Sequence, residues 1–251
     1  MFNEITVLLQ SYHQEELTTI AIKSFEKYKP DNLEVKYVVV EGSDDTNYKD
    51  TILKLSKNIV WKNNISADNN NPIMGASTAN GLNIEFGKQF IDTEWVFVCH
   101  NDIAVQSEKF FDVLRKESEK YQLISCCKDN MRIEACHISG LLVKNEILQK
   151  VDCMPSLPEL DVGDRLTQYC RDKNINYKSL PNTHNTPHIV SSIIDDFWRS
   201  AGENCGVDRC VVDGHVIFCH LGRGTPKFLN AYRKQGKVLH DDWCRIFKGE
   251  L

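Results

Sequence analysis

Residues 35–45 read Val-Lys-Tyr-Val-Val-Val-Glu-Gly-Ser-Asp-Asp, a β-branched run that ends in an acidic, polar turn. An apolar run of this length, bounded by turn residues, predicts a buried strand. Upstream, Ile5 to Leu9 is a second run of this kind, and the polar loop Gln10-Ser11-Tyr12-His13 follows it. Apolar residues at helical spacing from Leu17 to Tyr28 then predict a helix that Pro30 ends.

The chain downstream continues the same alternation. Apolar residues from Tyr48 to Leu55 predict a second helix, and Ile59 to Trp61 a third strand. Small residues open a third helix, from Gly75 to about Gln89, and let backbone approach a ligand there. Trp95 to Cys99 is a fourth strand that ends at His100-Asn101-Asp102. This order favours an α/β fold, a mostly parallel sheet with helices on both faces.

The rest of the chain adds an elaboration to this sheet. Further elements are predicted as follows: a helix at Phe110 to Leu114, strands at Leu123 to Cys126 and Ile138 to Val143, a helix from Val162 to about Lys173, an interrupted apolar run from Val211 to Cys219, and a terminal helix from Phe228 to Phe247. No internal repeat or low-complexity linker divides the chain. We therefore predict one domain over residues 1–251.

Composition excludes several classes of protein. The 251 residues include 30 Lys and Arg against 35 Asp and Glu, a formal net charge of −5, which disfavours a nucleic-acid binder. Hydrophobic residues make up 41% and charged residues 26%, values that predict a packed globular core. No apolar stretch approaches the ~20 residues that cross a bilayer, and Met1 to Gln10 lacks a secretion signal's features. We expect a cytoplasmic protein without a transmembrane segment.

The ten cysteines are spread through the chain. Several lie in apolar strand-like runs, such as Cys99 and Cys126, so we expect reduced core thiols and no disulfide scaffold. One cluster combines cysteine with histidine: Cys205, Cys210, His215, Cys219 and His220. Its spacings match no common zinc finger, so a structural zinc is the lesser alternative.

Polar clusters follow three of the predicted strands. They are Gln10 to His13, Glu41 to Asp45 and His100 to Asp102. Ligands of open parallel sheets bind beyond the carboxyl ends of the strands. We therefore expect these clusters to line one ligand site.

The segments resemble, in order and spacing, the family 2 type of nucleotide-sugar glycosyltransferases with the GT-A fold. That family has an acidic turn after its second strand, here Glu41-Gly42-Ser43, and a small-residue helix with an Asn, here Asn80. An apolar strand with a DxD motif follows, here Trp95 to Asp102. Ile138 to Val143 is similar to the family's small-residue strand, and Asp161-Val162-Gly163-Asp164 to its acidic catalytic motif. The resemblance covers roughly the first 180 residues.

The resemblance implies a GT-A-like domain with two functional halves. Residues 1–125 would bind the nucleotide sugar, and residues 126–251 the acceptor, with a C-terminal metal and phosphate loop. It implies transfer of a sugar from a UDP- or GDP-sugar to a hydroxyl of a saccharide or glycoconjugate, with Mn²⁺ or Mg²⁺ and with inversion. The donor sugar, the base, the acceptor and the oligomeric state stay open.

The DxD motif reads His100-Asn101-Asp102, so Asp102 is the one carboxylate retained. In many GT-A enzymes a C-terminal His completes the metal site, and the resemblance implies His220 for that role. His100 is then a second ligand, a donor to phosphate or a polar residue whose hydrogen bonds are satisfied within the protein. Arg223 and Lys227 are expected to contact the phosphates. An imidazole with a carboxylate suits Mn²⁺ better than Mg²⁺.

The acidic motif implies a general base. Inverting transfer needs a carboxylate to take the proton of the acceptor hydroxyl. Asp164 is the expected base and Asp161 the reserve. A carboxylate at a helix N-terminus also stabilises exposed backbone amides without any catalysis, so a capping role for both remains open.

The first two loops imply a nucleotide pocket. Ser11 and Tyr12 are expected to contact the base and ribose, with Tyr12 stacking, and Glu41 to accept from the base edge. Asp44–Asp45 is the alternative to Glu41. Asn80 is expected to hold the loop near the diphosphate.

Two other functions remain open at this point. A sugar-1-phosphate nucleotidyltransferase shares the sheet architecture, but the first loop lacks the glycine-rich, basic phosphate cradle. A non-catalytic GT-A relative, acting as a binding or scaffold protein, is favoured by the altered motif at His100 and by Ala79 in place of the family's Arg. His215 is the nearest competitor for the ligand role of His220.

Overall fold

The computed structural model describes residues 2–68, 75–128, 132–182, 208–222 and 236–251. Its strands are β1 (Glu4–Ser11), β2 (Glu34–Glu41), β3 (Ile59–Asn63), β4 (Trp95–His100), β5 (Ile103–Val105), β6 (Leu123–Ser125), β7 (Gly140–Lys144), β8 (Tyr177–Ser179), β9 (Asp208–Val212) and β10 (His215–His220). Its helices are α1 (Glu15–Tyr28), α2 (Lys49–Leu53), the 3₁₀ turn η1 (Ile65–Ala67), α3 (Ala76–Lys88), α4 (Lys109–Glu117), α5 (Asn145–Lys150), α6 (Asp164–Asp172) and α10 (Gly236–Glu250).

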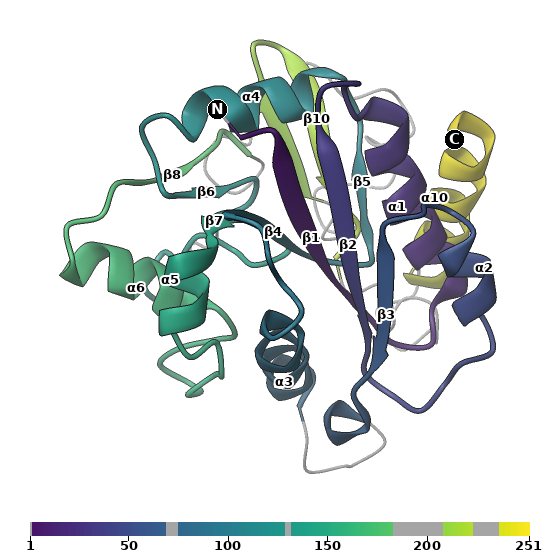
Figure 1. Ribbon diagram of the computed structural model, residues 1–251, viewed down its shortest axis with the longest axis horizontal. Helices are drawn as coiled ribbons and strands as arrows, with labels where there is room; N and C mark the ends of the chain where they lie inside the picture. The colour runs from purple at the N-terminus through teal and green to yellow at the C-terminus, as the bar shows by residue number, and fades with distance from the viewer. Residues whose placement is uncertain (1, 69–74, 129–131, 183–207, 223–235) are drawn as a thin grey trace.

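The main sheet has the order β3-β2-β1-β4-β7-β6-β8 (Figure 1). Strand β7 runs antiparallel to both of its neighbours, and the other pairings in this sheet are parallel. The sequence-based prediction of a mostly parallel α/β sheet is confirmed.

Successive side chains of the central strands point to opposite faces of this sheet and pack in two different core clusters. On one face, Val7 and Leu9 of β1 share a core cluster with Phe25 of α1 and Phe110 of α4. On the other face, Leu8 packs in a cluster built with α3, α5 and α6. Because helices cover both faces, the central strands are apolar almost throughout, and seven of the eight β1 residues are buried.

Strands β5, β10 and β9 form a second, antiparallel sheet. Its Phe218 ring lies 5.9 Å from Phe97 of the main sheet. Gly140 of β7 permits this approach, because a Cβ there would stand 2.8 Å from the Phe218 ring. Helix α10 packs on this sheet and on α1 through Trp243 and Phe247, and Figure 1 shows α1 and α10 side by side.

Some elements differ from the sequence-based expectation. The run from Val211 to Cys219 is a hairpin, turned at Asp213-Gly214 where both residues have positive φ. The strand expected over 138–143 begins two residues later, and the short elements β5, α5 and β8 were not predicted. The part of the expected helix 228–247 before Gly236 lies outside the described residues.

The nine cysteines that the structure describes are buried thiols, which confirms the expectation of reduced core thiols for them. Cys205 lies outside the described residues. Among the helices of the described ranges, none combines the length and the apolar character needed to span a bilayer.

Candidate active site

The carboxyl ends of three parallel strands meet at one edge of the main sheet. Ser11 at the end of β1 pairs with Glu41 of β2, and Gln10, one residue earlier, pairs with His100 at the end of β4. The three polar clusters of the sequence therefore lie at one edge, where open parallel sheets bind their ligands.

The β9–β10 hairpin brings a late residue to this edge. His220 of β10 pairs with Ile103 of β5, and the Leu221 amide donates to the Asp102 carbonyl at 2.8 Å. Because Ile103 directly follows Asp102, this pairing sets two buried side chains together. His220 Nε2 lies 3.3 Å from Asp102 Oδ1.

His220 lies between two carboxylates. Its Nδ1 is 3.1 Å from Asp208 Oδ2, and its Nε2 faces Asp102. Burial by itself lowers the pKa of His220, but the Asp102 and Asp208 carboxylates outweigh burial and raise that pKa to about 10. A ring held through one nitrogen by a carboxylate presents the other nitrogen in a fixed direction, as metal-binding histidines do.

His100 supplies a third potential ligand. One ring nitrogen of His100, a carboxylate oxygen of Asp102 and a ring nitrogen of His220 lie within 4.8 Å of one another. Burial lowers the pKa of His100 to about 4, although the Asp102 carboxylate opposes it. The ring is therefore neutral at pH 7. Within the described ranges, its buried Nε2 makes no hydrogen bond.

This donor set fits a divalent ion. Atoms bound at about 2.0–2.2 Å to one ion lie roughly 3–4.4 Å apart, so small side-chain adjustments close a shell around the three donors. Two imidazoles with one carboxylate suit Mn²⁺ better than Mg²⁺. Cys127, Asp208 and His220 form a second group whose donor atoms also lie within 4.8 Å of one another, so His220 belongs to two candidate sites.

His137 is a member of this cluster that the sequence reasoning missed. Its ring centroid lies 6.3 Å from that of His100 and 6.1 Å from that of His220. Its Nδ1 lies 2.8 Å from the Ser139 hydroxyl. The available signal was a histidine just before a small-residue strand, but its relevance depends on the antiparallel pairing of β7 with β4.

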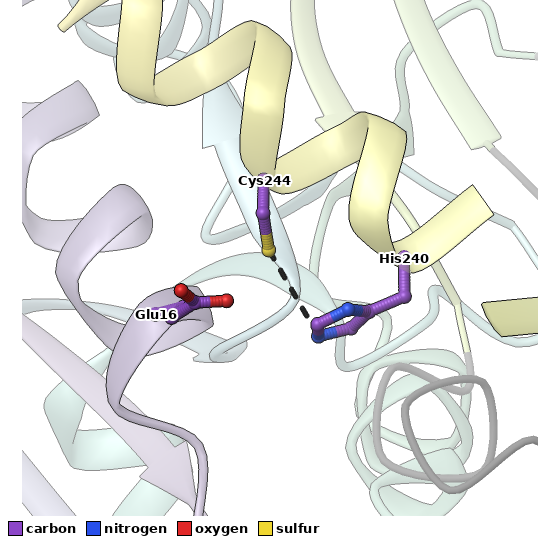
Figure 2. Close-up of side chains that lie close together, drawn as sticks. All are labelled: Glu16, His240 and Cys244. Atoms are coloured by element: carbon purple, nitrogen blue, oxygen red, sulfur yellow. Dashed lines mark hydrogen bonds between the residues drawn. The ribbon is translucent and has the colours of Figure 1, made fainter. Parts of the chain in front are cut away.

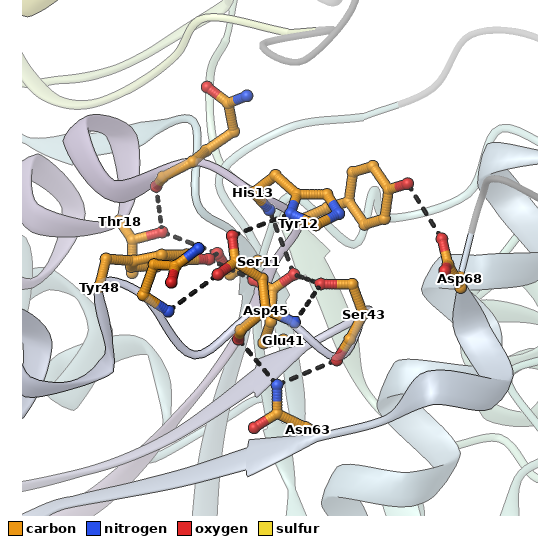
Figure 3. A network of polar contacts seen from close by, with 12 residues as sticks. Ser11, Tyr12, His13, Thr18, Glu41, Ser43, Asp45, Tyr48, Asn63 and Asp68 are labelled. Atoms are coloured by element: carbon orange, nitrogen blue, oxygen red, sulfur yellow. Dashed lines mark hydrogen bonds and ion pairs between the residues drawn. The ribbon is translucent and has the colours of Figure 1, made fainter.

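A buried polar network joins the first two loops (Figure 3). Glu41 is fully buried, and its carboxylate accepts from the His13 amide, the Ser43 hydroxyl and the Tyr48 hydroxyl. Ser11 is buried as well, with its hydroxyl 2.7 Å from that of Tyr48. These hydrogen bonds lie within the loops, and the expected contacts of Ser11 and Glu41 with the nucleotide stay a prediction.

Other side chains of these loops are closer to solvent. Tyr12 is half-buried, and its hydroxyl donates to Asp68 Oδ1 at 3.1 Å (Figure 3). Asp44 is exposed, whereas Asp45 Oδ2 lies 3.0 Å from His13 Nδ1. Tyr12 and Asp44 are therefore the better placed of these residues to meet a nucleotide.

Helix α3 contacts the second loop through Asn83. A Cβ at Gly42 would stand 2.8 Å from Asn83 Nδ2, and Asn83 Oδ1 accepts from Asn64 at 3.0 Å. Asn80 is half-buried one turn earlier, and its expected role near the diphosphate stays a prediction. Asn83 was missed because two asparagines on one helix look equivalent in sequence.

The acidic motif lies at the start of α6, as the sequence predicts, and Arg132 pairs with both of its carboxylates. Arg132 Nε lies 3.2 Å from Asp164 Oδ2, and its Nη2 lies 3.2 Å from Asp161 Oδ2. Asp164 Oδ2 also accepts the Asp161 amide at 2.8 Å. Burial raises the pKa of Asp164, although that amide and Arg132 oppose it. The Asp161 charge also raises the pKa of His100, as the smallest of several contributions.

The other candidate residues of the sequence lie away from this edge of the sheet or outside the described residues. Arg223, Lys227 and Cys205 lie outside the described residues. His215 is exposed at the hairpin turn, at the opposite end of β10 from His220. The cysteine and histidine cluster noted in the sequence is therefore not assembled within the described ranges.

No protein-family model matches the chain, and no curated protein does. Solved structures do resemble it. Mannosyltransferase PcManGT from Pyrobaculum calidifontis, in complex with GDP-Man and Mn²⁺, has a TM-score of 0.53 and 12% identity over 70% of this chain and 54% of that chain. This chain thus spans about half of that mannosyltransferase.

A second similar structure is glucosyl-3-phosphoglycerate synthase from Mycobacterium tuberculosis, in complex with Mn²⁺, UDP-glucose and phosphoglyceric acid. It has a TM-score of 0.50 and 14% identity over 70% of this chain and 69% of that chain. Identities this low establish similarity of fold. The chain has the GT-A fold that these nucleotide-sugar glycosyltransferases share.

Proposed function

We propose that this chain is a glycosyltransferase that moves a sugar, with inversion, from a UDP- or GDP-sugar to a hydroxyl of a saccharide or glycoconjugate. The proposal includes a divalent ion, Mn²⁺ in preference to Mg²⁺. The similar structures support it, because their complexes hold GDP-Man or UDP-glucose together with Mn²⁺. In this chain it depends on one observation, the meeting of His100, Asp102 and His220 at the carboxyl edge of the sheet.

These three residues would hold the ion. A divalent ion there neutralises the negative charge that develops on the departing diphosphate. Asp208 holds His220 through Nδ1, so that Nε2 faces Asp102. His100 is already neutral at pH 7, since its pKa is about 4, and its lone pair is available without loss of a proton.

We assign Asp164 as the base that takes the proton of the acceptor hydroxyl, with Asp161 as the alternative. Within the described ranges, the hydrogen bonds of Asp164 engage Oδ2, which leaves Oδ1 for the acceptor. Its raised pKa makes it a stronger base than an ordinary aspartate. As the acceptor oxygen bonds to the anomeric carbon and the bond to diphosphate breaks, the hydroxyl proton passes to Oδ1.

The nucleotide occupies the first two loops in this proposal. Tyr12 stacks on the base, while Ser11 and Glu41 hold the loop from beneath through their buried hydrogen bonds. Arg223 and Lys227 contact the phosphates.

A screen of nucleotide sugars for slow hydrolysis in Mn²⁺ tests the proposal. We expect turnover of one donor by the wild type and its loss in Asp102→Asn. Asp213→Asn is the matched control, because Asp213 is exposed at the hairpin turn with a positive φ that asparagine also tolerates. Equal turnover by the two variants would remove Asp102 from the site.

The alternative is a non-catalytic GT-A protein that binds or scaffolds. His100 favours it, because it replaces a carboxylate of the family motif, and so does His220, which is ion-paired on both ring nitrogens. Calorimetry with UDP and GDP, with and without Mn²⁺, separates the two functions. Metal-dependent binding that Asp102→Asn abolishes supports the enzyme, and binding of neither nucleotide supports the alternative.

A further inference from the structure

Helices α1 and α10 meet through a glutamate, a histidine and a cysteine that lie outside the candidate active site (Figure 2). His240 and Cys244 are four residues apart, so they share one side of α10, and Glu16 comes from the first turn of α1. The donor atoms of the three lie within 4.8 Å of one another. Cys244 Sγ is 3.9 Å from His240 Nε2.

The ring of His240 is held in an orientation that suits a metal ligand. Its Nδ1 lies 3.1 Å from the Asp241 carboxylate, and its Nε2 faces Cys244 Sγ. Two of the three side chains are shielded from water, since His240 is 1% exposed and Cys244 is 5% exposed, whereas Glu16 is exposed.

The spacing and the chemistry of these atoms match a zinc shell. Zn–S bonds of about 2.3 Å and Zn–N bonds of about 2.0 Å place sulfur and nitrogen roughly 3.5 Å apart around a tetrahedral ion. A thiolate ligand favours Zn²⁺ over Mg²⁺, Ca²⁺ and Mn²⁺. This separates the cluster from the candidate active site, where His100, Asp102 and His220 offer no sulfur.

Without an ion, the same groups pair with one another. Lys248 Nζ pairs with Glu16 Oε1, and the Cys244 thiol hydrogen-bonds the Glu16 carboxylate. Burial, and then the Glu16 charge, raise the pKa of Cys244 to about 12, so the thiol keeps its proton. A cation bound between these groups reverses that balance and displaces the proton.

We propose that Glu16, His240 and Cys244 bind one Zn²⁺ ion, with a water molecule as the fourth ligand. The ion fastens the C-terminal helix to α1, and α1 begins directly after the loop that holds Ser11 and Tyr12. This site stands independently of the proposed glycosyl transfer.

Cobalt substitution tests this site. Co²⁺ bound to a thiolate absorbs strongly in the near ultraviolet, and a tetrahedral shell gives it intense visible bands. We expect the thiolate signal in the wild type and its loss in Cys244→Ser and His240→Gln. His240→Gln keeps the thiol, so it serves where Cys244→Ser fails to fold. Cys170→Ser is the matched control, because Cys170 is likewise a buried thiol on a helix.

A second control separates the two cysteine-containing groups. Cys127 belongs to the group with Asp208 and His220, so Cys127→Ser should leave the thiolate signal intact. A signal that survives Cys244→Ser and vanishes in Cys127→Ser overturns the proposal, and so does a wild type without a thiolate signal. In the Asp102→Asn background, which weakens the candidate active-site ion site, we also expect Zn²⁺ to raise the thermal unfolding temperature of the single variant but not that of Asp102→Asn/Cys244→Ser. Equal stabilisation of the two by Zn²⁺ contradicts the site.

Discussion

His100 and His220 have opposite protonation states at pH 7, although their ring centroids lie 5.8 Å apart. Burial dominates at His100 and lowers its pKa to about 4, whereas Asp102 and Asp208 raise the pKa of His220 to about 10. One ring is therefore neutral and the other charged, which avoids repulsion between two buried cations. Both residues end an apolar strand, so the sequence alone does not distinguish them.

Arg132 tunes the proposed base, and its removal should shift the pH dependence of activity. The Arg132 charge lowers the pKa of Asp164, against the effect of burial. Arg132→Gln therefore raises that pKa, and the acid limb of the pH profile for donor hydrolysis moves to higher pH. Arg165→Gln is the control, because Arg165 pairs with Asp152. An unmoved acid limb in Arg132→Gln would argue against Asp164 as the base.

Tyr48 satisfies a buried carboxylate, so its hydroxyl should contribute to stability. It donates to Glu41 and lies 2.7 Å from the Ser11 hydroxyl. Tyr48→Phe should cost about 1–3 kcal/mol of unfolding free energy, because Glu41 then lacks a donor away from water. Urea denaturation measures this cost. Tyr121→Phe, at a half-buried tyrosine outside this network, should stay within about 0.5 kcal/mol of the wild type.

At the scale of elements, the three-residue strand β5 determines how the candidate ligands meet. It follows Asp102 directly and pairs with the end of β10, so His220 stands opposite Ile103. The hairpin turn at Asp213-Gly214 sets which residues of β10 reach that edge. Strand β5 was not predicted, because three apolar residues carry no usable periodicity.

One methyl group added at Gly140 should disturb the contact between β7 and β10. A Cβ at Gly140 would lie 2.8 Å from the Phe218 ring and 3.2 Å from Cys126 Cβ. Gly140→Ala should therefore destabilise the protein by about 1–3 kcal/mol, by overpacking. Because Phe218 shares β10 with His220, it should also weaken Mn²⁺ binding in calorimetry.

Gly249→Ala is the control for that substitution. Gly249 lies in helix α10, and a Cβ there would meet no atom within 4 Å. Alanine should be neutral or slightly stabilising at this position. If Gly140→Ala is as stable as Gly249→Ala, the β7–β10 contact accommodates the added methyl group without loss of unfolding free energy.

At the scale of the whole molecule, the candidate metal ligands come from distant parts of the chain. Asp102 lies in the first half of the chain, and His220 lies near the end of the second half, in a separate antiparallel sheet. An unfolded chain does not hold such ligands together, so ion binding is linked to folding.

Mn²⁺ should therefore stabilise the folded chain. At about 100 times its dissociation constant, the ion should add ~2.7 kcal/mol to the unfolding free energy. EDTA should remove this gain, and His220→Gln should lack it. His215→Gln, at the exposed turn of the same strand, should keep it. A gain that persists in His220→Gln would place the ion elsewhere.

Much of the fold is predictable from local patterns. The apolar runs at Ile5 to Leu9, Val35 to Val40 and Trp95 to Cys99 are strands in the structure, and the spaced apolar residues after each of the first two are helices. Side chains such as His137 and Asn83 escaped prediction, because their importance depends on the elements that pack against them.

The sequence by itself determined that this chain builds a mostly parallel sheet with polar loops at one edge, because strand periodicity and turn residues act over a few neighbours. Only the tertiary structure decided that His220 meets Asp102, that Glu41 lies beneath the loop, and that Glu16 meets Cys244. Those contacts join residues far apart in the chain. They depend on the packing of whole strands and helices, which no local pattern of residues encodes.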